Sequence, residues 1–260
     1  MIFADPSPID WGIARVTAPF ALFGASHLMA LGLSAALPVL ASAAIRPLAR
    51  PRADQIFRWA LGAAMTVNWF AWMLLLHGKG WLGVDNEFPL NLCDWATVAT
   101  VVTLFWPNQR TYELAYFWAL AGTLQGMLTP DVPFDFPDIQ FVLFFIFHGG
   151  IIASVLYLTL GLKMRPYPRS LPRVIGWTFV YAGTAGLFDW LSGANYGMLR
   201  AKPPYPTILD VMPPWPWYIG VLIVMGLAST VVYYVPFFVA DRMRAAKAMQ
   251  PATGRTVSTP

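Results

Sequence analysis

Seven long apolar segments, separated by connections rich in proline, place the strongest constraint on how this chain can fold. An apolar run of about 20 residues crosses the hydrocarbon core of a bilayer as a helix. Proline lacks the amide that a helix interior needs, so the connections "PLARPRAD", "PDVPFDFPD" and "RPYPRSLP" mark helix ends. We therefore predict an all-α, polytopic integral membrane protein that forms a seven-helix transmembrane bundle. Its predicted spans are residues 16–45, 56–76, 89–106, 111–128, 139–162, 172–191 and 215–240.

The composition agrees with a membrane protein and argues against several other classes. Hydrophobic residues make up 57% of the 260 residues and charged residues only 12%, whereas soluble domains carry about 25% charge. No basic run interleaved with aromatic residues indicates nucleic-acid binding. The single cysteine and the 3 histidines show no metal-ligand spacing, and no glycine-rich phosphate loop occurs. We therefore expect no nucleic acid, no metal and no cofactor.

The distribution of basic residues predicts which way the bundle faces. Most of the 17 Lys and Arg residues lie in one set of alternating connections and in the C-terminal tail. Cytoplasmic connections carry an excess of Lys and Arg, so we predict an external N-terminus and a cytoplasmic C-terminus. We also expect one transmembrane domain over residues 1–245, a polar tail over residues 246–260, and residence in the bacterial cytoplasmic membrane. The basic residues of the external connections are Arg15, Lys79, Arg200 and Lys202.

Polar side chains inside the predicted spans gather in the outer half of the membrane. At about 1.5 Å per helical residue, His27 lies roughly 15 Å from the outer end of its span, Cys93 about 6 Å and His148 roughly 13 Å. Gln125 and Asp189 lie near the outer ends of their own spans. The cytoplasmic half has nothing comparable. Polar groups within a membrane are costly, so this asymmetry predicts a functional site.

Cys93 and His148 have both a reactive and a structural interpretation. A cysteine nucleophile needs a base, and a histidine from another helix can supply one. Equally, a free cysteine packs as a small hydrophobe, and a histidine can bond to a neighbouring helix. Gly149 makes room beside His148 for a bulky substrate or for another helix, and Asp94 either caps the third helix or faces headgroups. Packing or interhelical hydrogen bonding is also an alternative for His27, Gln125 and Asp189.

Several motifs resemble those of a known family of membrane proteins. The segments "PLNLCDWA", "YELAYFWALAGTLQGMLTPD", "FFIFHGG", "GANYGMLRAKP" and "TILDVMPPWPWY" occur in the expected order. Together they resemble the YwaF-type integral membrane proteins, which are similar to the eukaryotic transmembrane protein 164 group. The resemblance runs from about the second predicted span to the seventh.

The resemblance implies a seven-helix membrane protein and, from the eukaryotic group, a phospholipid acyltransferase with a cysteine and a histidine at its active site. These correspond to Cys93 in "NLCD" and His148 in "FHGG". A looser relation to androgen-induced-protein-type lipid hydrolases also indicates fatty acyl esters. Bacterial members commonly carry a histidine or another polar residue before the Leu-Cys pair. Here that residue is Asn91, which can donate a hydrogen bond but cannot act as a base.

Two functions from different classes follow. In the first, the protein is a lipid acyltransferase or acyl hydrolase: His148 takes the proton from Cys93, the thiolate forms a thioester from a phospholipid, and the acyl group passes to a lysophospholipid or to water. Asn91, Gln125 or a backbone amide near Cys93 stabilises the oxyanion, and His27 is a second polar wall or an orienting group. In the second, the protein is a non-catalytic accessory subunit or lipid-binding scaffold, and the polar cluster holds helices together. The expected partners are membrane lipids and other proteins within the membrane.

A transporter is a third possibility with less support. The polar groups of the outer half do not continue through the membrane, apart from Asn68 in the second span and Glu113 in the fourth.

Overall fold

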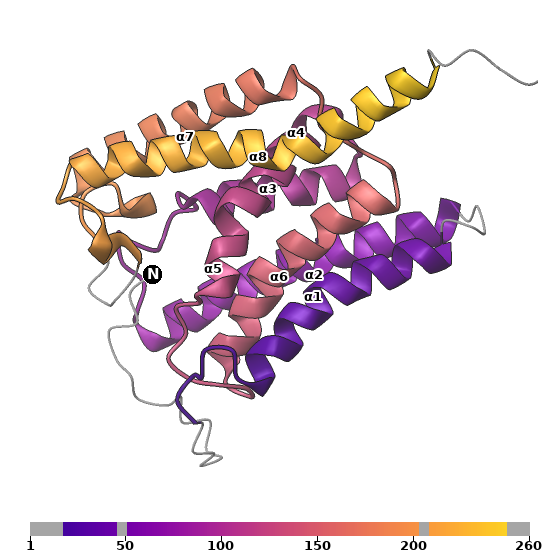
Figure 1. Ribbon diagram of the computed structural model, residues 1–260. Helices are drawn as coiled ribbons and strands as arrows, with labels where there is room; N and C mark the ends of the chain where they lie inside the picture. The colour runs from indigo at the N-terminus through magenta and orange to yellow at the C-terminus, as the bar shows by residue number, and fades with distance from the viewer. Residues whose placement is uncertain (1–17, 46–50, 203–207, 249–260) are drawn as a thin grey trace, which may run out of the picture.

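The computed structural model describes residues 18–45, 51–202 and 208–248, which fold into helices joined by loops (Figure 1). The π-helical segment η2 continues directly from α4 into α5, so residues 109–128 form one continuous helical stretch. The elements in chain order are α1 (Ala25–Ile45), α2 (Pro51–Lys79), α3 (Leu92–Phe105), α4 (Gln109–Trp118), η2 (Ala119–Thr123), α5 (Leu124–Leu128), α6 (Ile139–Leu160), α7 (Ser170–Ser192), η3 (Tyr196–Met198), η4 (Ile208–Val211) and α8 (Trp217–Ala248).

The described ranges contain helices and no β-strand, which confirms the all-α class. Each predicted span overlaps one helical stretch, but the first helix begins later than expected. An isolated antiparallel bridge between Pro19 and Phe134 holds the chain extended before α1 starts at Ala25. His27 therefore lies in the first turn of α1 and not deep along it. Residues 16 and 17, where the predicted span began, lie outside the described residues.

Helix α8 continues to Ala248, past the predicted end of its span at residue 240. The first residues of the predicted polar tail are therefore helical. The rest of that tail, residues 249–260, lies outside the described residues.

Four helices are long and apolar enough to cross a membrane, namely α1, α2, α6 and α8. The spans of α1 and α8 are only 11% buried within the protein, whereas that of α6 is 72% buried. Large apolar side chains such as Leu40 on α1 and Val224 on α8 are exposed. Exposed apolar surface of this extent requires apolar surroundings, which identifies a polytopic membrane protein. Membrane crossing by the other three helical stretches stays a prediction.

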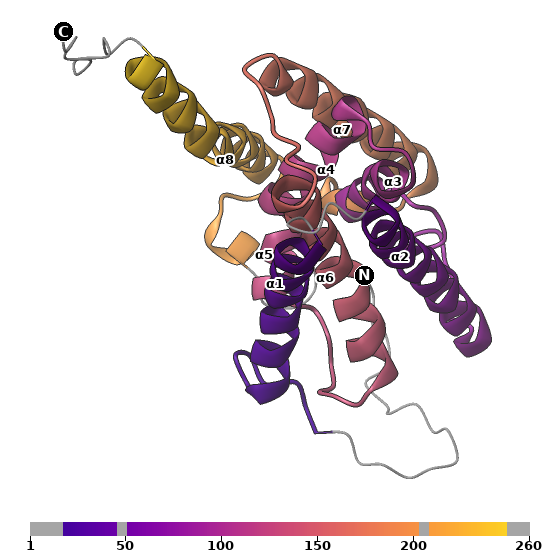
Figure 2. The same ribbon diagram turned by 90° about the vertical axis from the view of Figure 1, so that its right-hand side faces the viewer.

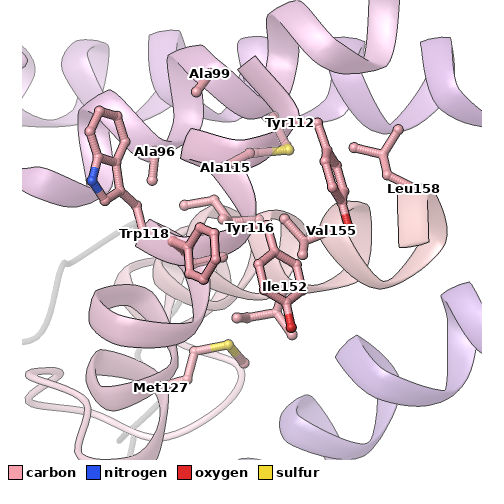
Figure 3. Packing of buried hydrophobic residues seen from close by; sticks show 14 of the residues in the cluster. Ala96, Ala99, Tyr112, Ala115, Tyr116, Trp118, Met127, Ile152, Val155 and Leu158 are labelled. Carbon is pink, nitrogen blue, oxygen red and sulfur yellow. The ribbon is translucent and has the colours of Figure 1, made fainter. Parts of the chain in front are cut away.

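The centre of the bundle is formed by α6 and by the continuous stretch α4–η2–α5. Figure 2 shows α1, α2, α7 and α8 arranged around these central helices. Small residues permit close packing here, because Ala96 and Ala99 of α3 lie against the α4 face that carries Ala115 (Figure 3). The side chains of Tyr116 and Ile152 fill the space between the α4–η2 stretch and α6.

The chain runs back and forth, so the bundle has two ends. We call the end that holds the 80–91 loop the cleft end, and the opposite end, where α3 finishes and α4 begins, the ion-pair end. Helices α1, α3, α6 and α8 begin at the cleft end, and α2, α5 and α7 finish there.

The ion-pair end contains buried charged groups, of which the sequence pattern indicated only Glu113. Glu113 is fully buried and pairs with Arg173 of α7. Arg58 is 8% exposed, pairs with Asp54 at 3.0 Å and donates to the Leu104 carbonyl. The expectation that this half has nothing comparable was therefore wrong. The cause is that the partners come from different helices and meet only in the folded bundle.

Candidate functional site

A cleft opens at the cleft end between α2, α6, the 80–91 loop and the first turn of α3. It holds about 640 Å³ of space, part of it continuous with the outside. Its walls combine aromatic rings with a few polar groups, which is a typical lining for an amphipathic ligand. The lining residues are Asn68, Trp69, Trp72, Met73, Asp85, Asn86, Phe88, Pro89, Asn91, Asp94, Leu143, Phe144, Phe147 and His148.

His148 lines the cleft, and one of its ring nitrogens makes no hydrogen bond to a described residue. Its Nδ1 lies 3.1 Å from the carbonyl oxygen of Phe144, and because a carbonyl only accepts, Nδ1 carries the proton. The imidazole also stacks on the Phe144 ring, with 4.1 Å between ring centroids. Its Nε2 makes no hydrogen bond to any described residue and is therefore an acceptor. A neutral histidine held in this tautomer has the form that a general base requires.

Cys93 is the second residue of α3 and lies beside the cleft without lining it. Its sulfur accepts a long hydrogen bond of 3.8 Å from the hydroxyl of Thr123 in η2. The ring of Tyr181 from α7 packs against Trp95, two residues after Cys93, with 5.6 Å between ring centroids. Thr123 and Tyr181 are both buried, so the thiol has polar neighbours within an otherwise apolar environment.

The central helical stretch relates Cys93 to His148. Thr123, which contacts the Cys93 sulfur, lies three residues before Gly126. A Cβ atom at Gly126 would lie 3.7 Å from Cδ2 and 3.8 Å from Nε2 of His148. Residues three apart share one face of a helix and are about 4.5 Å apart along its axis. Cys93 and His148 therefore border neighbouring positions on one face of this stretch.

Asn91 and Asp94 line the cleft at the start of α3. The Asp94 carboxylate accepts a 2.9 Å hydrogen bond from the Asn91 amide, which caps the start of α3. The Asn91 side-chain oxygen accepts a 3.3 Å hydrogen bond from the amide of Gly197 in the loop after α7. The geometry thus favours the capping interpretation of Asp94 and gives Asn91 a role in joining α3 to that loop.

Asp189 is fully buried and organises the same loop. One of its carboxylate oxygens accepts a 2.8 Å hydrogen bond from the amide of Tyr196. The Tyr196 hydroxyl in turn accepts one from the amide of Phe88, at the cleft. Burial raises the pKa of Tyr196 above its usual value, so this phenol stays neutral. Asp189 therefore supports the wall of the cleft from behind and does not line it.

His27 is buried in a cage of its own, away from the cleft lining. Its Nδ1 accepts a 3.0 Å hydrogen bond from the Phe23 amide, so Nε2 carries the proton and donates to the Met127 carbonyl at 2.8 Å. The rings of Phe20 and Phe145 also pack against it. Both ring nitrogens are used, which favours the structural interpretation of His27.

Gly149 and Gln125 do not face the cleft. A Cβ atom at Gly149 would collide with the hydroxyl of Ser34 on α1, so this glycine permits close approach of α1 to α6. Its neighbour Gly150 gives similar room to Met65 of α2, because a Cβ atom added at Gly150 would lie 3.0 Å from the Cγ atom of Met65. Gln125 is exposed on the outside of α5. The space at the glycine pair is therefore occupied by other helices.

Two further residues near the site, Thr123 and Tyr181, were not among those predicted from the sequence. Thr123 and Tyr181 had no distinguishing signal, because both are single hydroxyl residues in long helical stretches. In the described part of the chain, no group of at least 3 His, Cys, Asp or Glu residues could hold a metal ion. The expectations of no metal and no cofactor stay predictions.

The fold and the cleft together define a class: a polytopic helical membrane protein with an amphipathic cleft at one end of its bundle. Within that class, residues 22–234 match the TMEM164 family, and the chain belongs to this family. It is 28% identical over 225 residues to an uncharacterized protein of Treponema pallidum (strain Nichols), a stretch that covers 85% of this chain and 91% of the relative. No solved structure matches the chain significantly.

Proposed function

We propose that the protein is a membrane phospholipid acyltransferase in which Cys93 is the nucleophile and His148 is the general base. One observation supports this most strongly. The neutral imidazole is held by the Phe144 carbonyl, and its free Nε2 lies at the same helical face that Cys93 borders. Apo geometries of catalytic pairs are often longer than the reacting geometry, so the pair does not need to be in contact beforehand.

In the proposed reaction, His148 Nε2 takes the proton of the Cys93 thiol. The thiolate attacks the acyl carbonyl carbon of a phospholipid, and a carbon–sulfur bond replaces the carbon–oxygen ester bond. The leaving lysophospholipid oxygen receives the proton from His148. The hydroxyl of a second lysophospholipid, or water, then attacks the thioester, gives its proton to His148 and releases the cysteine, which regains its proton.

Backbone amides are better placed than side chains to stabilise the oxyanion. The Cys93 amide lies in the first turn of α3 and makes no hydrogen bond to another described residue. Such free amides at a helix start favour negative charge. In contrast, the oxygen of the Asn91 side chain is already bonded to Gly197, and Gln125 faces outward. We therefore assign the oxyanion contact to the Cys93 amide.

We also propose the finer membrane topology. All seven helical stretches cross the membrane, with the N-terminus outside and the C-terminus in the cytoplasm of a bacterium. The support is the excess of Lys and Arg in the connections at the ion-pair end. A Cys93→Ser background carrying Val84→Cys or Lys163→Cys tests this in spheroplasts, because both positions are exposed. An impermeant maleimide is expected to label the first and not the second, and the reverse pattern would disprove the orientation.

A covalent trap tests the reaction. Purified protein is incubated with phospholipids carrying a labelled acyl chain, and hydroxylamine-sensitive label is located by mass spectrometry. Label is expected on Cys93, absent in Cys93→Ser and strongly reduced in His148→Ala. His77→Ala is the matched control, because His77 is exposed on α2. Equal thermal unfolding of all variants excludes misfolding as the cause.

The same experiment separates the two classes of function. If a broad panel of phospholipids leaves Cys93 unlabelled, the acyltransferase proposal fails. The protein would then be a non-catalytic accessory subunit or a lipid-binding scaffold, with the thiol as a packing residue. Stable co-purification with another membrane protein would be the positive observation for that alternative.

A further inference from the structure

Asn68 lines the cleft and carries a buried hydrogen-bond acceptor that has no partner among the described residues. The residue lies in α2, is 5% exposed and lines the cleft. Its Nδ2 donates to the Leu143 carbonyl of α6 at 3.1 Å, and this bond fixes which amide atom is the oxygen. The Oδ1 atom is buried and has no hydrogen-bond partner among the described residues. Because an unpaired buried acceptor is unfavourable, the contents of the cleft should supply a donor there.

Asn68 of α2 and His148 of α6 bond to consecutive carbonyls of α6. The Asn68 amide bonds to the carbonyl of Leu143, and the His148 imidazole bonds to the carbonyl of Phe144, the next residue. Their depths also agree. Asn68 lies 11 residues before the end of α2, which is about 16 Å from the cleft end. His148 lies nine residues after the start of α6, which is about 13 Å from the same end. Both residues line the same cleft at a similar depth, and each carries one acceptor without a hydrogen bond to a described residue, Oδ1 of Asn68 and Nε2 of His148.

The number of O–H bonds on the acyl acceptor decides whether it can donate a hydrogen bond to both Asn68 Oδ1 and His148 Nε2. Water has two O–H bonds and can donate one to each acceptor. The hydroxyl of a lysophospholipid has one O–H bond, which must go to His148 if the oxygen is to be activated. The Asn68 oxygen would then stay unpaired in a buried environment. A pair of acceptors therefore favours water over an alcohol.

We propose that Asn68 is a positioning residue for water, and that it shifts the Cys93 thioester towards hydrolysis and away from transfer. This inference rests on the proposed acyl-enzyme chemistry. The water oxygen attacks the thioester carbonyl carbon, one water proton passes to His148 Nε2, and the carbon–sulfur bond breaks. The proton then returns to the cysteine sulfur and a fatty acid leaves. The second water proton stays on the acid and is the one directed at Asn68 during attack.

The test compares two products of one thioester. Full-length protein in nanodiscs receives a phospholipid with a labelled acyl chain together with an unlabelled lysophospholipid. Labelled fatty acid and labelled acyl-transfer product are quantified, and their ratio is the readout. The Asn68→Leu variant removes the acceptor at similar volume, and its ratio of hydrolysis to transfer is expected to fall about fivefold, the factor of one hydrogen bond of typical net strength.

Two further variants distinguish positioning from a structural role. Asn68→Asp keeps an acceptor of similar size but loses the bond to the Leu143 carbonyl, so its ratio should fall less than that of Asn68→Leu. A merely structural Asn68 would affect Asn68→Asp as much as Asn68→Leu. Thr66→Val is the matched control on α2, because the Thr66 hydroxyl bonds within its own helix and the residue is exposed, away from the cleft.

The outcomes separate this inference from the proposed function. Label on Cys93 with an unchanged product ratio in Asn68→Leu would overturn the role of Asn68 and leave the acyl enzyme intact. Equal loss in Asn68→Leu and Asn68→Asp would also overturn it. Absence of label on wild-type Cys93 would overturn both proposals together.

Discussion

Replacing His27 with alanine tests whether this histidine is a structural residue. The substitution removes two hydrogen bonds, from the Phe23 amide at 3.0 Å and to the Met127 carbonyl at 2.8 Å. A stranded buried carbonyl costs about 1–3 kcal/mol, and the lost ring leaves space among three aromatic side chains at about 1–2 kcal/mol. Allowing for the small net strength of hydrogen bonds within membranes, we expect a total loss of about 2–4 kcal/mol.

The assay for His27→Ala is unfolding in mild detergent, with His27→Gln as a companion variant. Glutamine can still donate to the Met127 carbonyl, so it should recover part of the lost stability. Acyl labelling of the folded fraction is measured in parallel and should be unchanged per folded molecule. Wild-type stability combined with lost labelling would refute the reasoning and return His27 to the group of chemically active residues.

Three other changes have specific expected outcomes. Arg173→Ala leaves Glu113 as an uncompensated buried charge, so it should lower the free energy of unfolding by about 3 kcal/mol. Adding Glu113→Leu should restore part of this loss, and urea or SDS titration measures both effects. Gly150→Val places branched carbon atoms against Met65, at a cost of about 1–3 kcal/mol, and an undiminished unfolding temperature would contradict this close packing. Tyr181→Phe removes the hydroxyl beside the thiol, and we expect slower acyl labelling of the cysteine in time courses, with stability changed by less than about 1 kcal/mol.

The helices were predictable because hydropathy and proline act within a short segment. The pattern placed α6 to within two residues, since the apolar run from 139 onwards has no competing signal. It misplaced the start of α1, where pairing of Pro19 with Phe134, far along the chain, overrides the local apolar run. Local patterns thus predict helices well and fail where a distant partner sets the boundary.

The residues of the candidate site were also only partly predictable from the sequence. The sequence singled out Cys93 and His148 as candidates, because polar residues in apolar runs differ from their surroundings. It could not separate them from His27, which has the same chemistry and the same kind of neighbours. Only the Met127 carbonyl, contributed by α5, shows that both nitrogens of His27 are occupied, whereas one nitrogen of His148 stays free.

The amino-acid sequence by itself determined the all-helical class, the apolar spans and the family membership, because these depend on the order of residue types along one segment. The tertiary structure alone decided that Gly149 admits Ser34 of α1, that Gln125 faces outward and that Asn68 lines the cleft. The physical reason is that each helical residue turns the side chain by about 100°. Which direction is the inside then depends on how neighbouring helices pack, and this involves residues far apart in the chain.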